Sequence, residues 1–132
     1  HFKTLNDTQG HAVGDQLLVL VAQRISECVR EADTVARFGG DEFVVMLSEL
    51  DERKAESTAE AGRVAEKIRS RLAQPYLLAG NHHEMIEYRC TASIGVVLFI
   101  NHEARLDDIL KWADAGMYKA KDEGRNRVYF VD

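Results

Sequence analysis

The sequence has a single proline, and its shortage of cysteine and lack of a long apolar run each exclude a class of protein. Its two cysteines, Cys28 and Cys90, lie in apolar segments without the CxxC spacing of a zinc site, so we expect no disulfide scaffold and a reducing, cytoplasmic setting. The longest apolar stretches, 17–22 and 94–100, are well below the roughly 20 residues that span a membrane. We therefore expect no membrane contact by this segment.

Excess positive charge is also lacking. The net charge is −5, and a protein that binds nucleic acid without regard to sequence needs a cationic face to displace counterions from phosphates. We expect no nucleic-acid partner, although a local cluster of cations remains compatible with one small phosphorylated ligand. A length of 132 residues with 45% hydrophobic content suffices for one buried core.

The start of the chain is abrupt. It begins at His1 without an initiator methionine or a signal peptide. We therefore interpret residues 1–132 as one N-terminally truncated domain of a larger protein.

Apolar residues recur at helical spacing in three segments. The first segment starts near Gly14 with Asp15 as the expected N-cap, the second ends before Pro75, and the third stops near Gly124. The apolar positions are Leu18, Val21, Ala22, Ile25 and Val29 in the first; Ala61, Val64, Ala65, Ile68 and Leu72 in the second; and Leu106, Ile109, Leu110, Ala113 and Met117 in the third.

β-Prone runs alternate with these helices. Segments 34–38 and 42–47 are predicted to form a hairpin across Gly39 and Gly40, because glycine adopts the positive φ angles of tight turns. The other expected strands are 76–78, 87–89, 91–100 and 128–131.

This order of elements predicts the α/β class, as a layered α+β sandwich in which helices cover a central, mostly antiparallel sheet. One strand before the first helix would complete a ferredoxin-like βαββαβ core. We expect that missing first strand to precede His1.

The hairpin carries the first candidate for chemistry. Asp41 and Glu42 directly follow Gly39 and Gly40, so a phosphate can approach the backbone amides while adjacent carboxylates hold a metal ion such as Mg²⁺. The alternative is that the glycines only make a turn and the acids are solvated.

Several motifs, in order along the whole chain, resemble the GGDEF family of diguanylate cyclase domains. The resemblance implies a nucleotidyl cyclase-like version of the sandwich above. The motifs are residues 2–7 (FKTLND), 10–15 (GHAVGD), 37–43 (RFGGDEF), 91–95 (TASIG), and 113–126, which contains Asp114, Tyr118, Lys119 and Ala120 before the final GRN.

The resemblance implies that Asn6 and Asp15 read the edge of a guanine and that His11 lies near the nucleotide. Carboxylate and amide groups suit this task, because guanine offers N1–H and an N2 amine as donors and adenine offers no such pair. Other interpretations remain open: a helix N-cap for Asp15, an Asx-turn for Asn6 and a backbone-bonded loop histidine for His11.

The resemblance also implies that Lys3, Lys121 and Arg125 neutralise the triphosphate of GTP as pyrophosphate leaves. Lys121 and Arg125 have an alternative role as helix C-terminal charges. In the family, Asp41 is assigned as proton acceptor and metal ligand, and Glu42 assists. We favour the ligand role, because a metal lowers the basicity of a bound carboxylate. Mg²⁺ is the expected ion, and Mn²⁺ is a possible substitute.

The reaction implied is the attack of each GTP 3′-hydroxyl on the α-phosphate of a second GTP, which yields cyclic di-GMP and pyrophosphate. Since one domain holds one GTP, two copies must face each other, and we expect a homodimer. Arg30 and Asp33 resemble the RxxD site at which the product inhibits. An Arg–Asp pair at a helix end is the alternative, and Lys67 stands where some relatives carry a second product-binding arginine.

One metal-binding aspartate of the family would lie before His1 and is absent from this sequence. The fragment alone is therefore expected to be inactive. A second hypothesis is a catalytically inactive module that binds GTP or cyclic di-GMP and regulates an attached domain, such as an EAL phosphodiesterase.

Overall fold

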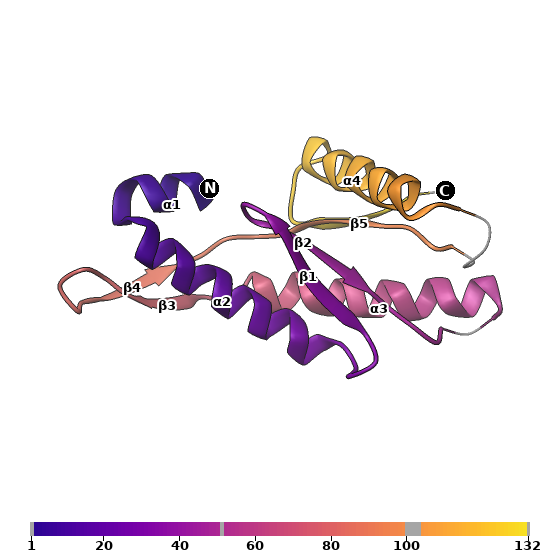
Figure 1. Cartoon of the computed structure of the whole chain (residues 1–132), viewed down its shortest axis with the longest axis horizontal. Coiled ribbons are helices and arrows are strands. Elements are labelled where there is room, and N and C mark those ends of the chain that lie inside the picture. Colours follow the sequence, from indigo (N-terminus) through magenta and orange to yellow (C-terminus); the bar gives the residue numbers. More distant parts are fainter. Residues whose placement is uncertain (1, 51, 100–103, 132) are drawn as a thin grey trace. The chain divides into compact units, whose positions relative to one another are not determined.

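The protein is described by a computed structural model that covers residues 2–50, 52–99 and 104–131 (Figure 1). Contacts divide the chain into two compact units. The first contains His1–Ser48 and Arg71–Cys90, and the second contains Glu49–Ser70 and Thr91–Asp132. Each unit is described by itself.

The first unit holds two helices and two antiparallel strand pairs. The helices are α1 (Phe2–Gln9) and α2 (His11–Cys28); the strands are β1 (Thr34–Gly39), β2 (Glu42–Met46), β3 (Tyr76–Ala79) and β4 (Met85–Tyr88). Strand β1 pairs with β2, and β3 pairs with β4. The buried core consists of Leu5, Val13, Leu17, Tyr76 and Leu78, and the partly buried Leu20, Val21, Ile86, Tyr88 and Cys90 pack against it.

The N-cap of α2 is Gly10, five residues before the predicted Asp15, and α1 was not predicted at all. Gly10, with φ of 90°, separates the two helices. Its N–H donates to the carbonyl of Asn6, and its own carbonyl accepts from Gly14. The predicted N-cap role of Asp15 is therefore wrong, because Asp15 lies inside α2. The Asx-turn interpretation of Asn6 is also wrong, because Asn6 lies inside α1.

The second unit pairs a helix with a parallel strand pair. It holds most of α3 (Lys54–Leu72), together with β5 (Ser93–Val96), α4 (Leu106–Asp122) and β6 (Arg127–Phe130). Helix α4 packs on β5 and β6, as Figure 1 shows. A Cβ on Gly95 would overlap the backbone oxygen of Ala113. Glycine at position 95 therefore permits the close approach of helix and strand.

The strands differ from prediction in extent and pairing. The expected strand 91–100 is shortened to β5, because its partner β6 has only four residues to pair with it, and Ile100 lies outside the described residues. Among the described strands, three two-stranded sheets replace the expected central sheet. A ladder forms only between strands about 4.8 Å apart, so each sheet ends where no further strand lies at that spacing. The α/β class itself is as predicted.

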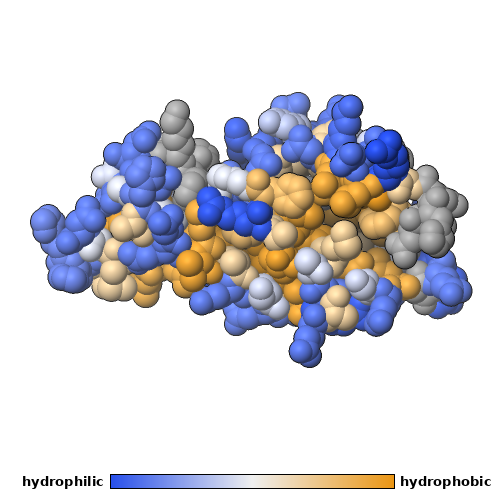
Figure 2. Space-filling model, in the orientation of Figure 1, coloured by the Kyte–Doolittle hydropathy of each residue, from blue (hydrophilic) through white to orange (hydrophobic). Residues whose placement is uncertain are grey.

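Apolar side chains also remain at the surface, and Figure 2 shows apolar atoms between polar ones on the face in view. The exposed large apolar residues are Val19, Phe38, Met46, Leu77, Met85, Phe99, Leu106, Trp112 and Tyr118. In the part of the chain that the structure describes, no helix combines the length and apolarity needed to cross a membrane.

Candidate active site

The β1–β2 hairpin presents the predicted glycine and acidic residues. Gly39 pairs with Glu42 across the hairpin, so Gly40 and Asp41 form the two-residue loop, and a bulge lies between Arg37 and Gly39. The loop was predicted at Gly39 and Gly40, and it lies one residue later in the structure. Gly39 and Gly40 have φ angles of 136° and 51°. The predicted need for positive φ at these two positions is confirmed.

Open space lies in front of both glycines. A Cβ placed on Gly39 or Gly40 would meet no atom within 4 Å, so conformation and not packing requires glycine here. The Arg37 Nε donates to the carbonyl of Gly40 over 2.9 Å and holds the loop. The loop can therefore receive a bulky anionic group against its backbone without a side chain in the way.

Asp41 and Glu42 are both exposed on this loop. Within residues 2–50, 52–99 and 104–131, no group of three His, Cys, Asp or Glu side chains is arranged to hold a metal ion. Two neighbouring carboxylates still fit Mg²⁺, which is commonly held by one or two carboxylates together with water and substrate phosphates. Asp41 and Glu42 would be those ligands.

Asp41 of the hairpin loop acts electrostatically on residues at and after the end of β4. Burial raises the pKa of Tyr88, and the neighbouring charges of Cys90 and Asp41 raise it further. Burial likewise raises the pKa of the Cys90 thiol, with Asp41 adding to the effect. Tyr88 and Cys90 pack against the core cluster that contains Leu5. Asp41 therefore acts electrostatically on two residues that pack against this core cluster.

Asn6 follows Leu5 in α1 and carries an unusual polar atom. Its Oδ1 is buried and has no hydrogen-bond partner in the structure. An unpaired buried acceptor costs about 1–3 kcal/mol, so such an atom calls for an explanation. A ligand that donates a hydrogen bond to Asn6 would remove this cost.

His11 and Asp15 lie four residues apart on α2 and are both exposed. This spacing places them on the same face of the helix, one turn apart. The loop interpretation of His11 is wrong, since His11 is the first residue of α2. Lys3 lies in α1, but its side chain is outside the described part of the structure.

The predicted phosphate-binding cations belong to the second unit. Lys121 lies in the last turn of α4, with its Nζ 5.5 Å from the centroid of the Tyr118 ring. Arg125 follows the end of this helix, is exposed, and has a φ of 62°. Both cations are therefore placed where the helix dipole favours positive charge, as the alternative interpretation expected.

Asp33 of the RxxD segment anchors the turn after α2. Its carboxylate accepts hydrogen bonds from the backbone N–H of Ser48 and of Arg30, each at 2.9 Å. Burial raises the pKa of Asp33, but these two hydrogen bonds and the Arg30 charge outweigh it and hold the pKa below its usual value. The Arg30 side chain is 56% exposed, whereas that of Asp33 is 2% exposed. The Arg30 Nη2 also donates to the Ser48 carbonyl, and its Nε lies 3.7 Å from Asp33 Oδ2, so the Arg–Asp pair of the alternative interpretation is present. A ligand of Arg30 would compete with these contacts, and Asp33 chiefly supports the turn.

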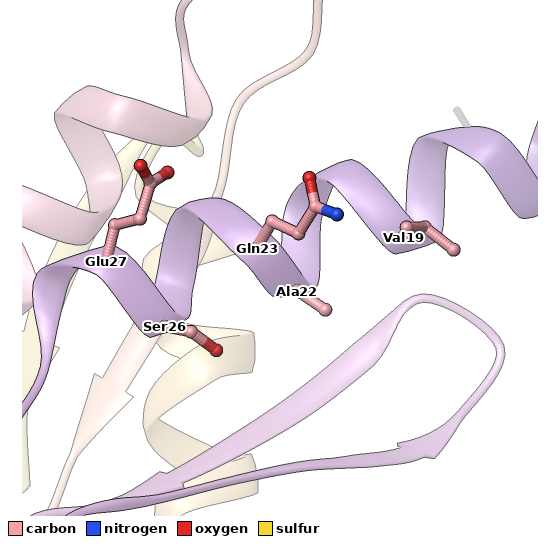
Figure 3. Close-up of a pocket in the computed structure, with 5 residues that line it drawn as sticks. All are labelled: Val19, Ala22, Gln23, Ser26 and Glu27. Atoms are coloured by element: carbon pink, nitrogen blue, oxygen red, sulfur yellow. The ribbon is translucent and has the colours of Figure 1, made fainter. Parts of the chain in front are cut away.

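Two hollows lie near α2. The larger, of about 570 Å³, is lined only by residues of this helix: Val19, Ala22, Gln23, Ser26 and Glu27 (Figure 3). It contains none of the predicted site residues, so we assign it no substrate. The smaller, of about 300 Å³, lies over the RxxD segment and is lined by Ser26, Val29, Arg30, Glu31, Asp33 and Val35.

Sequence reasoning missed two side chains, Gln16 and Arg69, that join segments far apart in sequence. Gln16 makes two hydrogen bonds of 2.8 Å with the backbone of Ala79. Arg69 binds Asn126, which is 57 residues away in sequence, over 2.7 Å. Apart from the GRN motif that contains Asn126, no local sequence signal indicates these contacts.

Comparison with known proteins extends these observations. A family model described as "Diguanylate cyclase, GGDEF domain" matches residues 1–127. MucR of Pseudomonas aeruginosa, a bifunctional diguanylate cyclase/cyclic di-GMP phosphodiesterase, is 43% identical over 131 residues, which make up 99% of this chain and 18% of MucR. The chain spans 18% to 34% of the length of the first three curated relatives.

Solved structures agree with this match. The GGDEF domain of YfiN from P. aeruginosa is 37% identical with a TM-score of 0.82, over 100% of this chain and 76% of that one. The GGDEF domain of DgcB from Caulobacter crescentus, in complex with c-di-GMP, is 30% identical with a TM-score of 0.80, over 98% and 71% of the two chains. With its glycine hairpin, its paired acids and a match along nearly its whole length, this chain belongs to the GGDEF family of diguanylate cyclase domains.

Proposed function

We propose that this domain condenses two GTP molecules into cyclic di-GMP and two pyrophosphates. The observation that carries the proposal is the buried, unpartnered Oδ1 of Asn6 on α1, in a domain whose β1–β2 hairpin also presents Asp41 and Glu42 after two open glycines. An acceptor without a partner fits a ligand that brings a donor. Family membership makes guanine the donor to test first.

Guanine recognition would use side chains of α1 and α2. The exposed carboxylate of Asp15 can accept from N1–H and the N2 amine together, and Asn6 Oδ1 can accept from the same edge. His11, one turn from Asp15 on the same helix face, would contact the nucleotide beside them. Adenine presents no equivalent donor pair, so this arrangement would select GTP over ATP.

Phosphate handling would use the hairpin and the cations. The open backbone at Gly39 and Gly40 would receive phosphate oxygens. A Mg²⁺ ion, or Mn²⁺ in its place, held by Asp41 and Glu42 would supply charge neutralisation at the phosphates. Lys3, Lys121 and Arg125 would offset the charge that develops on the leaving pyrophosphate.

The reaction needs a second copy of the domain. Each 3′-hydroxyl attacks the α-phosphate of the other GTP, so that one P–O bond forms and the bond to pyrophosphate breaks, once in each direction. Since one site binds one GTP, a twofold homodimer would bring the two nucleotides together. The activity per mole of protein should therefore rise with protein concentration in the range where the dimer forms.

Product inhibition would act through the hollow over the RxxD segment. The exposed Arg30 guanidinium can form a forked pair with a phosphate or with the acceptor edge of guanine. Asp33 would hold the turn in place for that contact.

Neighbouring domains of a larger signalling protein and a cytoplasmic setting remain predictions.

The proposal is tested by incubating the full-length protein with GTP and Mg²⁺ and measuring cyclic di-GMP and pyrophosphate. Asp41→Ala should abolish both products, whereas Asp108→Ala, which removes an exposed carboxylate in the first turn of α4, should not. Binding of GTP or cyclic di-GMP without any product from the unaltered protein would reject the cyclase and favour a regulatory module.

A further inference from the structure

A side-chain relay, defined here as the contacts from Glu66 to Arg69 and from Arg69 to Asn126, joins α3 to the turn after α4 in the second unit. The Arg69 Nη1 donates to the Oδ1 of Asn126 over 2.7 Å. On its other side, the Arg69 Nε lies 3.0 and 2.9 Å from the two carboxylate oxygens of Glu66, and Nη2 also donates to Glu66. The Glu66 carboxylate therefore orients the guanidinium whose remaining N–H groups face Asn126.

The turn that Asn126 belongs to has an unusual backbone. Gly124, Arg125 and Asn126 have successive φ angles of 123°, 62° and 48°. A non-glycine residue is unfavourable in the left-handed region, and it persists there only where surrounding contacts determine its conformation. Arginine lacks the short polar side chain that makes this region easier for asparagine.

Local contacts hold only part of this turn. The Arg125 N–H donates to the carbonyl of Ala120 over 2.9 Å, which closes the end of α4. The Arg127 Nε donates to the carbonyl of Arg125 over 3.2 Å. Both contacts join residues no more than five apart in sequence. The bond from Arg69 is different, because it ties the turn to another helix, 57 residues away.

We propose that the Glu66–Arg69 pair is a positioning device for Arg125. Arg69 holds Asn126 in its left-handed conformation, and this fixes the backbone from which the Arg125 guanidinium reaches the triphosphate. The inference rests on the proposed function, since it assigns Arg125 to phosphate binding. It adds two residues on α3 that the family motifs do not include.

A structural role alone would have different consequences. A Glu–Arg pair three residues apart on a helix surface contributes little to stability by itself. Its loss would then leave nucleotide binding unchanged or weaken all nucleotides equally. A positioning role predicts a loss that depends on the phosphates and on the presence of Arg125.

The experiment measures GTP and GMP affinity by calorimetry on the full-length protein and three single variants. We expect Arg69→Ala to weaken GTP about 10-fold, equivalent to about 1.4 kcal/mol, with a smaller effect on GMP. Arg69→Lys, which keeps one donor for Asn126, should recover part of the loss. Arg63→Ala removes an exposed cation from the same helix and is the control with no expected effect.

The decisive comparison is a double-mutant cycle with Arg125→Ala. If Arg69 acts through Arg125, adding Arg69→Ala to Arg125→Ala should cause no further loss of GTP affinity. Additive losses, or equal losses for GTP and GMP, would overturn the positioning role while leaving the proposed function intact. A protein that binds no GTP before any substitution would instead refute the proposed function, and this inference with it.

A readout without nucleotide completes the test. Backbone NMR couplings of Arg125 and Asn126 report their φ angles directly. Arg69→Ala should shift both residues away from the left-handed region, and Arg63→Ala should not. Unchanged couplings in the Arg69 variant would contradict the relay even if nucleotide affinity fell.

Discussion

The Arg24 guanidinium carbon lies 3.7 Å from the centroid of the Tyr76 ring. The same guanidinium donates to three carbonyls that end α3 and lead into β3, those of Arg71 at 3.1 Å, Gln74 at 2.7 Å and Pro75 at 2.6 Å. The Tyr76 ring is fully buried, and its hydroxyl donates to the carbonyl of Leu72 over 2.9 Å. Burial, with neighbouring Cys90, raises the pKa of Tyr76 to about 12. This pair therefore joins α2 to the start of β3.

Removing the Arg24 side chain should lower stability clearly. Arg24→Ala removes three hydrogen bonds and uncovers the Tyr76 ring. Among the described residues, only the Arg71 carbonyl keeps a second donor, the Gln74 N–H, so we expect a loss of about 2–3 kcal/mol in the free energy of unfolding. Urea denaturation followed by circular dichroism measures it. Arg71→Ala is the matched control, because it removes only the half-exposed pair with Glu27 and should cost at most about 1 kcal/mol. Equal losses for the two variants would contradict the special role of Arg24.

The Asp33 anchor should make stability depend on acid pH. Because the folded pKa of Asp33 is lowered, its stabilisation is complete above the unfolded pKa of about 3.9 and is lost as the pH falls through the folded value. Asp33→Asn keeps one acceptor oxygen for two N–H donors and should cost about 2 kcal/mol at pH 7. The gap between the two proteins in the free energy of unfolding, measured by urea denaturation, should narrow below about pH 4. A gap that stays constant down to pH 2 would exclude the charge of Asp33 as its source.

Asp15 should select guanine over adenine. Asp15→Ala is expected to weaken GTP binding by about 10-fold or more, the effect of losing a bidentate base contact, while ATP binding changes little. Alanine favours helix at this interior position of α2, so circular dichroism should be unchanged. Glu27→Ala removes an exposed acid from the same helix and serves as the control. Parallel losses of GTP and ATP would argue against base reading by Asp15.

The two hairpin glycines should differ in tolerance. Gly39 has a φ of 136°, a region essentially closed to other residues, whereas Gly40 at 51° lies where asparagine is tolerated. Gly39→Ala should therefore cost about 1–3 kcal/mol and abolish product formation. Gly40→Asn should fold with little loss of stability. Thermal unfolding compared across Gly39→Ala, Gly40→Ala and Gly40→Asn measures this order, and equal tolerance at both positions would refute it.

Much of the fold was readable from local pattern. Apolar residues at helical spacing located α2, α3 and α4, and adjacent glycines located the β1–β2 hairpin. These signals are local, because helical periodicity and positive φ are properties of neighbouring residues. Helix α1 was missed, because its motif was assigned to nucleotide contacts and Gly10, which ends it, was not recognised as a boundary between two helices.

By itself, the sequence determined the family, the helices after Gly10 and the need for glycine at positions 39 and 40. Only the tertiary structure decided that Asn6 Oδ1 is buried without a partner, that both oxygens of Asp33 bind backbone, and that Arg69 reaches Asn126. The reason is physical: backbone preferences act between neighbours in the chain, whereas burial and side-chain pairing depend on which distant segments pack together.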